Sequence, residues 1–211
     1  MKLYYTLCII VLILLIVWHV RWFYASRVER PDMIVESQKK NIKIVTLPSR
    51  ISASVQVAWD PIDAPSKAFG LLAGFIFGDN TKQSSIQMTA PVTSTAVASE
   101  KIAMTAPVIA EKTDTNLTKV SFLMPSSWTL ETLPVPNNKN ITIQEESPKK
   151  IAVWTFSGYA QAKKVEKEWK SFQEELENQS IQWTWSYTIA QYNDPGTPPW
   201  MRRNELRVSL E

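Results

Sequence analysis

The side chains most often used for covalent catalysis and for binding transition metals are nearly absent from this 211-residue chain. It has one cysteine and one histidine, Cys8 and His19, and both lie within the first twenty residues. Beyond them the sequence excludes disulfides, zinc sites made of Cys and His, Cys nucleophiles and His-based triads. Only five glycines occur and no glycine-rich phosphate-binding motif is present. An enzyme built from the remaining residues would depend on carboxylates, Lys, Ser or Tyr.

The carboxylates that could do such chemistry flank one apolar segment. Asp60, Asp63 and Asp79 lie at or near the two ends of residues 61–77. Nothing in their spacing pairs them for acid–base work, and an Asp beside a helix normally caps it. We therefore expect no catalytic residues and no metal site.

The excess of basic residues is confined to the N-terminal segment. The formal net charge is +3. Four of the 23 Lys and Arg, but only one of the 20 Asp and Glu, lie in residues 1–30, so the remainder of the chain is neutral. A neutral domain has no general electrostatic attraction to nucleic acid. We therefore expect no nucleic-acid partner.

Residues 3–20 form an almost uninterrupted apolar run. As a helix, a run of this length spans roughly 27 Å, close to the thickness of a bilayer's hydrocarbon core. Aromatic residues at its end, from Trp18 to Tyr24, are typical of the headgroup layer. We predict a single-pass membrane anchor within residues 1–30. The alternative is a cleaved signal peptide, for which no clear small-residue cleavage site is present. The Arg residues after the run favour a cytoplasmic location for the domain.

Residues 31–211 contain the same order of elements twice, about one hundred residues apart. Ile42–Ile44 resembles Ile141–Ile143, and Pro48–Ala53 resembles Pro148–Val153. A helix is expected after each pair, and two strands after each helix. The expected helices are 61–77 and 161–177, and the expected later strands are 84–93, 101–110, 182–192 and 204–210. We predict an α+β fold in which two strand–strand–helix–strand–strand halves form one antiparallel sheet system or barrel, because neither half can bury its apolar face alone.

The two expected helices differ in character. The second places five apolar residues at helical spacing among Lys and Glu, which is an ordinary amphipathic pattern: Ala162, Val165, Trp169, Phe172 and Leu176. Residues 68–77 of the first helix are apolar on every side. We expect this helix either to lie under another layer, such as the anchor or a membrane surface, or to form the wall of a hydrophobic groove.

Several short motifs occur in a fixed order along the same region. They are Met88–Val92 and Met104–Val108, which both read Met-Thr-Ala-Pro-Val, then Phe122–Ser126, Thr155–Gly158 and Tyr192–Glu205. This ordered set resembles the SOUL family of haem-binding proteins over residues 31–211. The resemblance implies a distorted antiparallel β-barrel of two pseudo-symmetric halves, each with a helix. It also implies non-covalent binding of haem and related tetrapyrroles without catalysis. We interpret the two Met-Thr-Ala-Pro-Val segments as strands that build the barrel.

The resemblance further implies a ligand pocket between the first helix and the loop before Arg202. The residues at the corresponding positions are Lys67 as the basic group, Leu71, Leu72 and Phe75 as the apolar wall, Trp200 on the loop side, and Arg202 as a partner for a propionate. No histidine remains in this region to coordinate iron. We therefore expect haem or another tetrapyrrole to bind without a histidine axial ligand.

Three functions are compatible with these features. The leading hypothesis is a membrane-anchored, non-catalytic protein that binds haem or a related tetrapyrrole. The alternative is an adaptor of the same fold, whose apolar helix binds a protein or membrane partner and no tetrapyrrole. The third is an enzyme acting on a tetrapyrrole or a small acid, and it has the least support because its carboxylates are unpaired.

Overall fold

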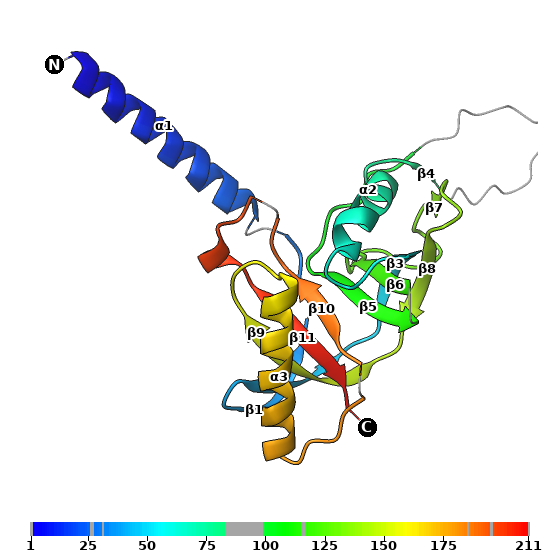
Figure 1. Cartoon of the computed structure of the whole chain (residues 1–211). Coiled ribbons are helices and arrows are strands. Elements are labelled where there is room, and N and C mark those ends of the chain that lie inside the picture. The colour runs from blue at the N-terminus through cyan, green and yellow to red at the C-terminus, as the bar shows by residue number, and fades with distance from the viewer. Residues whose placement is uncertain are drawn as a thin grey trace, which may run out of the picture.

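A curled antiparallel sheet forms the centre of the computed structural model, which describes residues 2–25, 28–30, 32–82, 99–114, 117–184, 186–194 and 196–210. Two helices, α2 (Ala64–Ile76) and α3 (Ala162–Asn178), pack against the sheet, and a third, α1 (Lys2–Ala25), projects away from it (Figure 1). A short 3-10 helix, η1 (Pro199–Met201), precedes the last strand.

Nine strands of the described residues form the large sheet, in the order β1-β2-β9-β11-β10-β5-β6-β3-β8. A separate two-stranded ribbon pairs β4 with β7. No pairing among the described residues joins the edge strands β1 and β8, so the sheet is an open half-barrel and not a closed barrel. The strand bounds are β1 (Ile34–Lys39), β2 (Ile42–Leu47), β3 (Arg50–Val57), β4 (Asn80–Thr81), β5 (Val108–Asp114), β6 (Leu117–Leu123), β7 (Val135–Pro136), β8 (Thr142–Glu146), β9 (Lys149–Phe156), β10 (Thr188–Gln191) and β11 (Asn204–Ser209).

The internal repeat predicted from the sequence is present in this topology. The first half is β2-β3-α2-β5-β6, and the second is β8-β9-α3-β10-β11. The offset of about one hundred residues relates β2 to β8 and β3 to β9. The halves exchange their first strands, because β2 pairs with β9 and β8 pairs with β3. This exchange, together with the pairing of β10 with β5, joins the halves into one sheet.

The first helix begins later than the sequence predicts. Helix α2 starts at Ala64, three residues after Pro61. The Asp60 carboxylate accepts hydrogen bonds from the backbone N–H groups of Ile62 and Asp63, at 2.8 and 3.2 Å, and these bonds hold the preceding residues in a turn. Asp60 therefore has a structural role in the turn, but it is not the helix cap that was expected. Asp63 occupies the N-cap position, and its side chain makes no capping hydrogen bond.

The expected strand over residues 101–110 is wrong for most of its length. Residues 101–107 lead into β5 and pass beside the C-terminal end of α2, where the N–H of Ile102 donates to the carbonyl of Ile76. Pro107 has no N–H to donate to a neighbouring strand, and regular pairing starts only at Val108. The expected strand over 84–93, which includes the first Met-Thr-Ala-Pro-Val motif, lies outside the described residues. The neighbour of β5 in the first half is instead β6.

Each half has its own apolar core beneath its helix. In the first half, Leu72, Phe75 and Ile76 of α2 pack against residues of β3 and β6. In the second half, Phe172 and Leu176 of α3 pack against residues of β9 and β11. The two clusters lie under separate helices, so α2 and α3 hold equivalent positions in the repeat.

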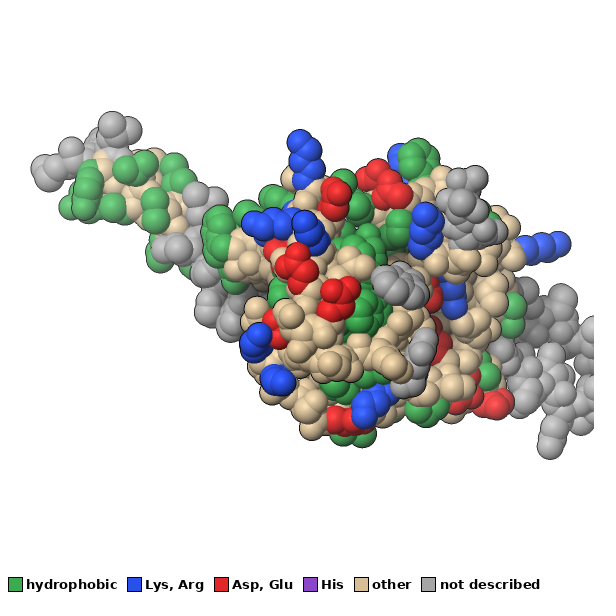
Figure 2. All heavy atoms as spheres, turned by 60° about the horizontal axis from the view of Figure 1, so that its bottom comes forward, with side chains coloured by type: hydrophobic (Ala, Val, Ile, Leu, Met, Phe, Trp, Pro, Cys, Tyr) green, Lys and Arg blue, Asp and Glu red, His purple; other side chains and the backbone are tan. Residues whose placement is uncertain are grey.

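Helix α1 is apolar along its length, and its described side chains are exposed. Figure 2 shows them as a hydrophobic surface projecting from a body on which charges of both signs are interspersed. Within the described ranges, no helix reaches the length and hydropathy required to cross a membrane.

The segment after α1 already belongs to the folded body. Val28 and Met33 pack against an apolar cluster that includes Ala106 and Tyr192. The carbonyl of Glu29 accepts the N–H of Ala106 at 2.9 Å. Contacts with the body therefore begin at Val28, just before residue 31, where the domain was expected to start.

Candidate ligand-binding site

Helix α2 presents two different faces. Its inner face is buried on the sheet, and both Leu72 and Phe75 are fully covered there. The apolar wall expected from Leu71, Leu72 and Phe75 therefore does not exist as one exposed surface. Of these three residues, only Leu71 is exposed, at 38%.

The outer face of α2 is nevertheless apolar. Lys67, Gly70, Leu71, Gly74 and Phe77 follow one another at helical spacing and so lie on one side of the helix. A Cβ atom at Gly70 would meet nothing within 4 Å, so the backbone is open there. We call these five residues, together with Trp59, the α2 outer strip.

The ammonium group of Lys67 lies at one end of the α2 outer strip. Its Nζ lies 4.7 Å from the centre of the Trp59 ring, a cation–π contact. Trp59 and Phe77 are both exposed large apolar side chains. The strip thus combines exposed apolar surface with one cation at the Lys67 end, and the Asp79 side chain lies beside Gly74 at the other end.

Trp200 and Arg202 lie in the other half of the molecule. Trp200 belongs to η1, which is held beside the end of β9 because the N–H of Gly158 donates to the carbonyl of Pro199 at 2.9 Å. The Arg202 guanidinium lies 4.5 Å from the centre of the Tyr159 ring, and its Nε donates to the carbonyl of Thr197 at 2.8 Å. Figure 1 shows η1 and α2 on different halves of the body. The structure therefore brings Lys67 and Leu71 together, but it does not bring Trp200 or Arg202 to them.

The Arg-Arg-Asn-Glu segment forms a buried charge network. Glu205 is completely buried, and its carboxylate accepts hydrogen bonds from Arg203, Arg207 and Tyr192. Burial alone would raise the pKa of Glu205, but the two guanidinium groups outweigh it and hold that pKa below its usual value. Burial raises the pKa of Tyr192 to about 12. These charges stabilise the sheet and are not free to bind a ligand.

The second Met-Thr-Ala-Pro-Val motif has a structural role. The Thr105 hydroxyl donates to the carbonyl of Leu123, and Ala106 is buried between the linker and the sheet. Met104 packs against the first core.

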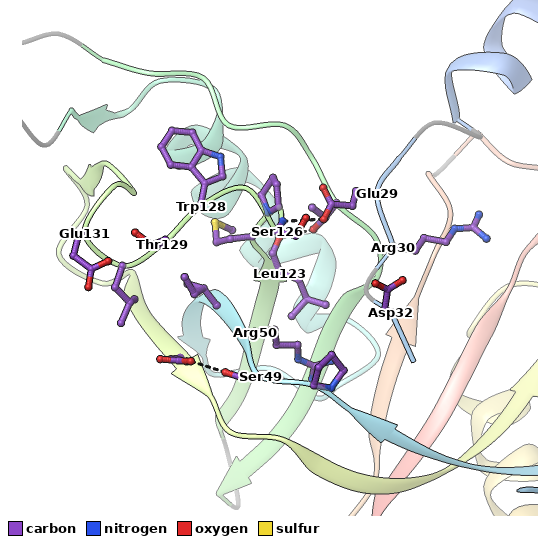
Figure 3. A pocket seen from close by; sticks show the side chains of 17 residues that line it. Glu29, Arg30, Asp32, Ser49, Arg50, Leu123, Ser126, Trp128, Thr129 and Glu131 are labelled. Atoms are coloured by element: carbon purple, nitrogen blue, oxygen red, sulfur yellow. Dashed lines mark hydrogen bonds between the residues drawn. The ribbon is translucent and has the colours of Figure 1, made fainter. Parts of the chain in front are cut away.

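A pocket of about 640 Å³ lies at the end of the first half of the sheet (Figure 3). Five segments form it: the linker after α1, the start of β3, Thr105 before β5, the end of β6 with the loop after it, and Glu145 on β8. Apolar atoms come mainly from the half-buried Trp128 and from Ile51, Met124 and Leu130.

Carboxylates dominate the charge of this pocket. They are Glu29, Asp32, Glu131 and Glu145. The Arg30 side chain points away in Figure 3 and lies over the Tyr192 ring, while Arg50 is paired with Glu146 at 2.8 Å. A hydrogen bond from Thr129 lowers the pKa of Glu131. The pocket therefore repels anionic groups.

Sequence reasoning did not identify this pocket. Its residues come from five segments with no shared spacing. Two of these segments belong to the ordered motifs: Thr105 lies in Met104–Val108, and the residues from Leu123 to Ser126 lie in Phe122–Ser126. The motifs alone do not show that these segments meet. Their proximity is seen only in the folded structure, where the Ser126 N–H donates to the Glu29 carboxylate at 2.8 Å and the Ser49 hydroxyl donates to the Glu145 carboxylate at 2.5 Å.

Solved structures of the same fold come from proteins of different kinds. A hydrolase from Listeria innocua has 11% sequence identity and a TM-score of 0.53, with 83% of this chain and 94% of that chain covered. The C-terminal domain of EcmrR has 11% identity and a TM-score of 0.54, with 81% of this chain and 96% of that chain covered. At such low identity these likenesses establish the fold alone.

Sequence comparison identifies the family. No curated protein sequence matches the chain. The profile described as SOUL heme-binding protein matches residues 28–209, which include the whole repeat and the ordered motifs. The chain therefore belongs to the SOUL heme-binding protein family.

Proposed function

We propose that this protein is a non-catalytic binding protein for haem or a related tetrapyrrole, and that the ligand lies on the α2 outer strip. Family membership supports the ligand class. The observation that carries the location is the exposed apolar surface around Leu71, which ends at the Lys67 ammonium group. A flat apolar ring with anionic propionates matches that combination.

The strip offers the contacts that a porphyrin needs without rearrangement of the core. The missing side chain at Gly70 lets a planar ligand approach the helix backbone. Leu71, Trp59 and Phe77 supply apolar contact area, at about 25 cal/mol per Å² removed from water. Lys67 can turn from Trp59 toward a propionate. Leu72 and Phe75 hold the helix in place from below.

The acidic pocket is a poorer location for this ligand. Its four carboxylates would face the propionates, and only the paired Arg50 could offset them. The pocket has a suitable volume, but its charge has the wrong sign. We therefore place the tetrapyrrole on α2 and not in the pocket.

In this proposal, coordination of the haem iron contributes little to the binding free energy. Among the described residues of the body there is no histidine, and Met104 is packed against the first core. Binding then depends on apolar burial and on one ion pair, so the affinity should be modest.

A Soret titration of the full-length protein with haem, and a parallel fluorescence titration with metal-free protoporphyrin, test this proposal. Saturable binding of both ligands with similar dissociation constants is the expected result. Unchanged spectra at micromolar haem would reject tetrapyrrole binding. A preference for haem above about a hundredfold would mean that a protein atom coordinates the iron.

The same proposal places the domain at a membrane. It rests on the apolar run at residues 3–20 and on the exposure of the described side chains of α1. Exposed apolar helices of this kind are stabilised by lipid. The basic residues after the run favour the cytoplasmic side. The protein should remain with membranes after carbonate extraction, and release into the supernatant would contradict the anchor.

An adaptor function is the second candidate. The helix surface is open at Gly70, which also permits close approach of a helix from a protein partner, while the Asp79 side chain lies beside Gly74. In that case the titrations would show no tetrapyrrole binding, while substitutions on the strip would still abolish association with the partner.

A further inference from the structure

The most exposed aromatic side chain of the described body is Trp200, on η1. Its exposure is 77%, and the neighbouring Met201 and Tyr159 are exposed by 37% and 48%. Burial of such side chains is normally favourable, and apolar side chains grouped on the surface commonly mark a contact with another phase or partner.

Hydrogen bonds fix the backbone of the described residues around Trp200. Asp194 accepts N–H groups from Gly196 and Thr197, and Met201 donates to Pro198. Gly158 makes two further hydrogen bonds here. Its N–H donates to the carbonyl of Pro199 in η1, and its carbonyl accepts a hydrogen bond from the side-chain amide of Asn204 at 2.8 Å. Gly158 has a φ of 92°, a conformation that favours glycine. The exposure of Trp200 is therefore built into the fold.

The loop that carries Trp200 lies beside the linker that follows α1. In the view of Figure 1, η1, the short red helix before β11, is drawn near the end of α1. The contacts agree, because Arg30 of the linker and Arg203 after η1 lie over the same Tyr192 ring, at 5.8 and 4.6 Å from its centre. A bilayer that holds α1 would therefore lie close to Trp200.

The chemistry of this surface suits the boundary between lipid and water. Trp and Tyr favour the headgroup layer, and Arg favours anionic headgroups. Here Trp200 and Met201 project outward, while Arg202 lies over the Tyr159 ring at their side. From these observations we infer that Tyr159, Trp200, Met201 and Arg202 form a second membrane contact, which docks the body on the bilayer surface next to α1. This inference rests on the proposed membrane anchor.

Quenching of tryptophan emission by brominated lipids tests the docking. The full chain is reconstituted in vesicles of phosphatidylcholine and phosphatidylglycerol, with and without brominated acyl chains. The wild type is compared with Trp200→Ser and with the matched variant Trp59→Ser, which lies on the α2 side and is also exposed. Removing a quenched tryptophan lowers the quenched fraction of the emission, and removing an unquenched one raises it.

The expected result is a smaller quenched fraction for Trp200→Ser and a larger one for Trp59→Ser. If the chain floats with the vesicles but Trp200→Ser raises the quenched fraction or leaves it unchanged, the docking surface is wrong and the anchor stands. If the chain does not float with the vesicles, the anchor fails and the docking fails with it.

A label at Met201 gives a second readout that does not depend on counting tryptophans. In a Cys8→Ser background the chain has no other cysteine. A polarity-sensitive maleimide at Met201→Cys should shift its emission to the blue in vesicles, and the same label at Phe77→Cys should not. Equal shifts at the two positions would also overturn the docking surface.

Discussion

Helices α2 and α3 hold equivalent positions in the repeat but expose different surfaces. Both pack one apolar face on their own half of the sheet. The outer face of α3 is covered with Lys and Glu, including Glu175, which pairs with Lys40 at 3.1 Å. In α2 the only charged residue is Lys67, and Leu71 and Gly70 face outward. Packing does not require an apolar outer face, as α3 demonstrates, so the surface of α2 points to contact with a ligand or partner.

The inner faces should be equally important for stability. Leu72→Ala in α2 should destabilise the fold by about 2–5 kcal/mol, and Phe172→Ala in α3 by about 3–5 kcal/mol, because each leaves a cavity in a fully buried site. Urea unfolding of both variants measures this. A loss below about 1 kcal/mol for Leu72→Ala would mean that α2 is not packed as described.

Two ion-paired carboxylates of the sheet, Glu205 and Glu146, allow a second comparison. Glu205 is completely buried between Arg203 and Arg207, whereas the Glu146 partner of Arg50 is partly exposed. Both carboxyl pKa values are held below normal, against the effect of burial. Glu205→Gln should therefore cost about 3–5 kcal/mol at neutral pH, because two guanidinium groups lose their buried partner. Glu146→Gln should cost less.

The pH dependence of this effect has a definite sign. A carboxyl group whose pKa is lowered on folding stabilises the folded state above its unfolded pKa, here 4.5, and that stabilisation is lost as the pH falls through the lower folded pKa. The difference in urea midpoint between wild type and Glu205→Gln should shrink as the pH falls below 4.5. A difference that stays constant down to pH 3 would contradict the assignment.

The smallest effect is expected at Lys67. Its ammonium group is exposed, so an ion pair with a propionate contributes at most about 1 kcal/mol, or about fivefold in affinity. Lys67→Ala should therefore weaken haem binding by less than this factor, and the difference should vanish at high salt. A larger or salt-independent loss would show that Lys67 does more than attract a propionate.

The sequence predicted the repeat and the two packing helices because hydrophobic spacing is a local property. It did not predict that β2 and β8 change places between the halves, since strand patterns do not specify the partner strand. It also assigned Leu72 and Phe75 to the ligand surface. A helix that is apolar on all sides carries no periodic signal to separate its buried face from its exposed face. The sequence also did not predict that Trp200 and α2 lie in different halves of the molecule, because their positions follow from the order of the strands in the sheet.

The central claim is that the ligand binds on the outer face of α2, and paired substitutions in a Soret titration test it most directly. Leu71 and Leu130 are similarly exposed, at 38% and 41%, but Leu130 lines the acidic pocket. Leu71→Asp should weaken haem binding at least about tenfold, since it places a carboxylate beneath the porphyrin ring. Leu130→Asp should change the affinity by less than about twofold, because surface substitutions away from a site have small effects. The reverse order, or equal losses, would contradict a site on α2.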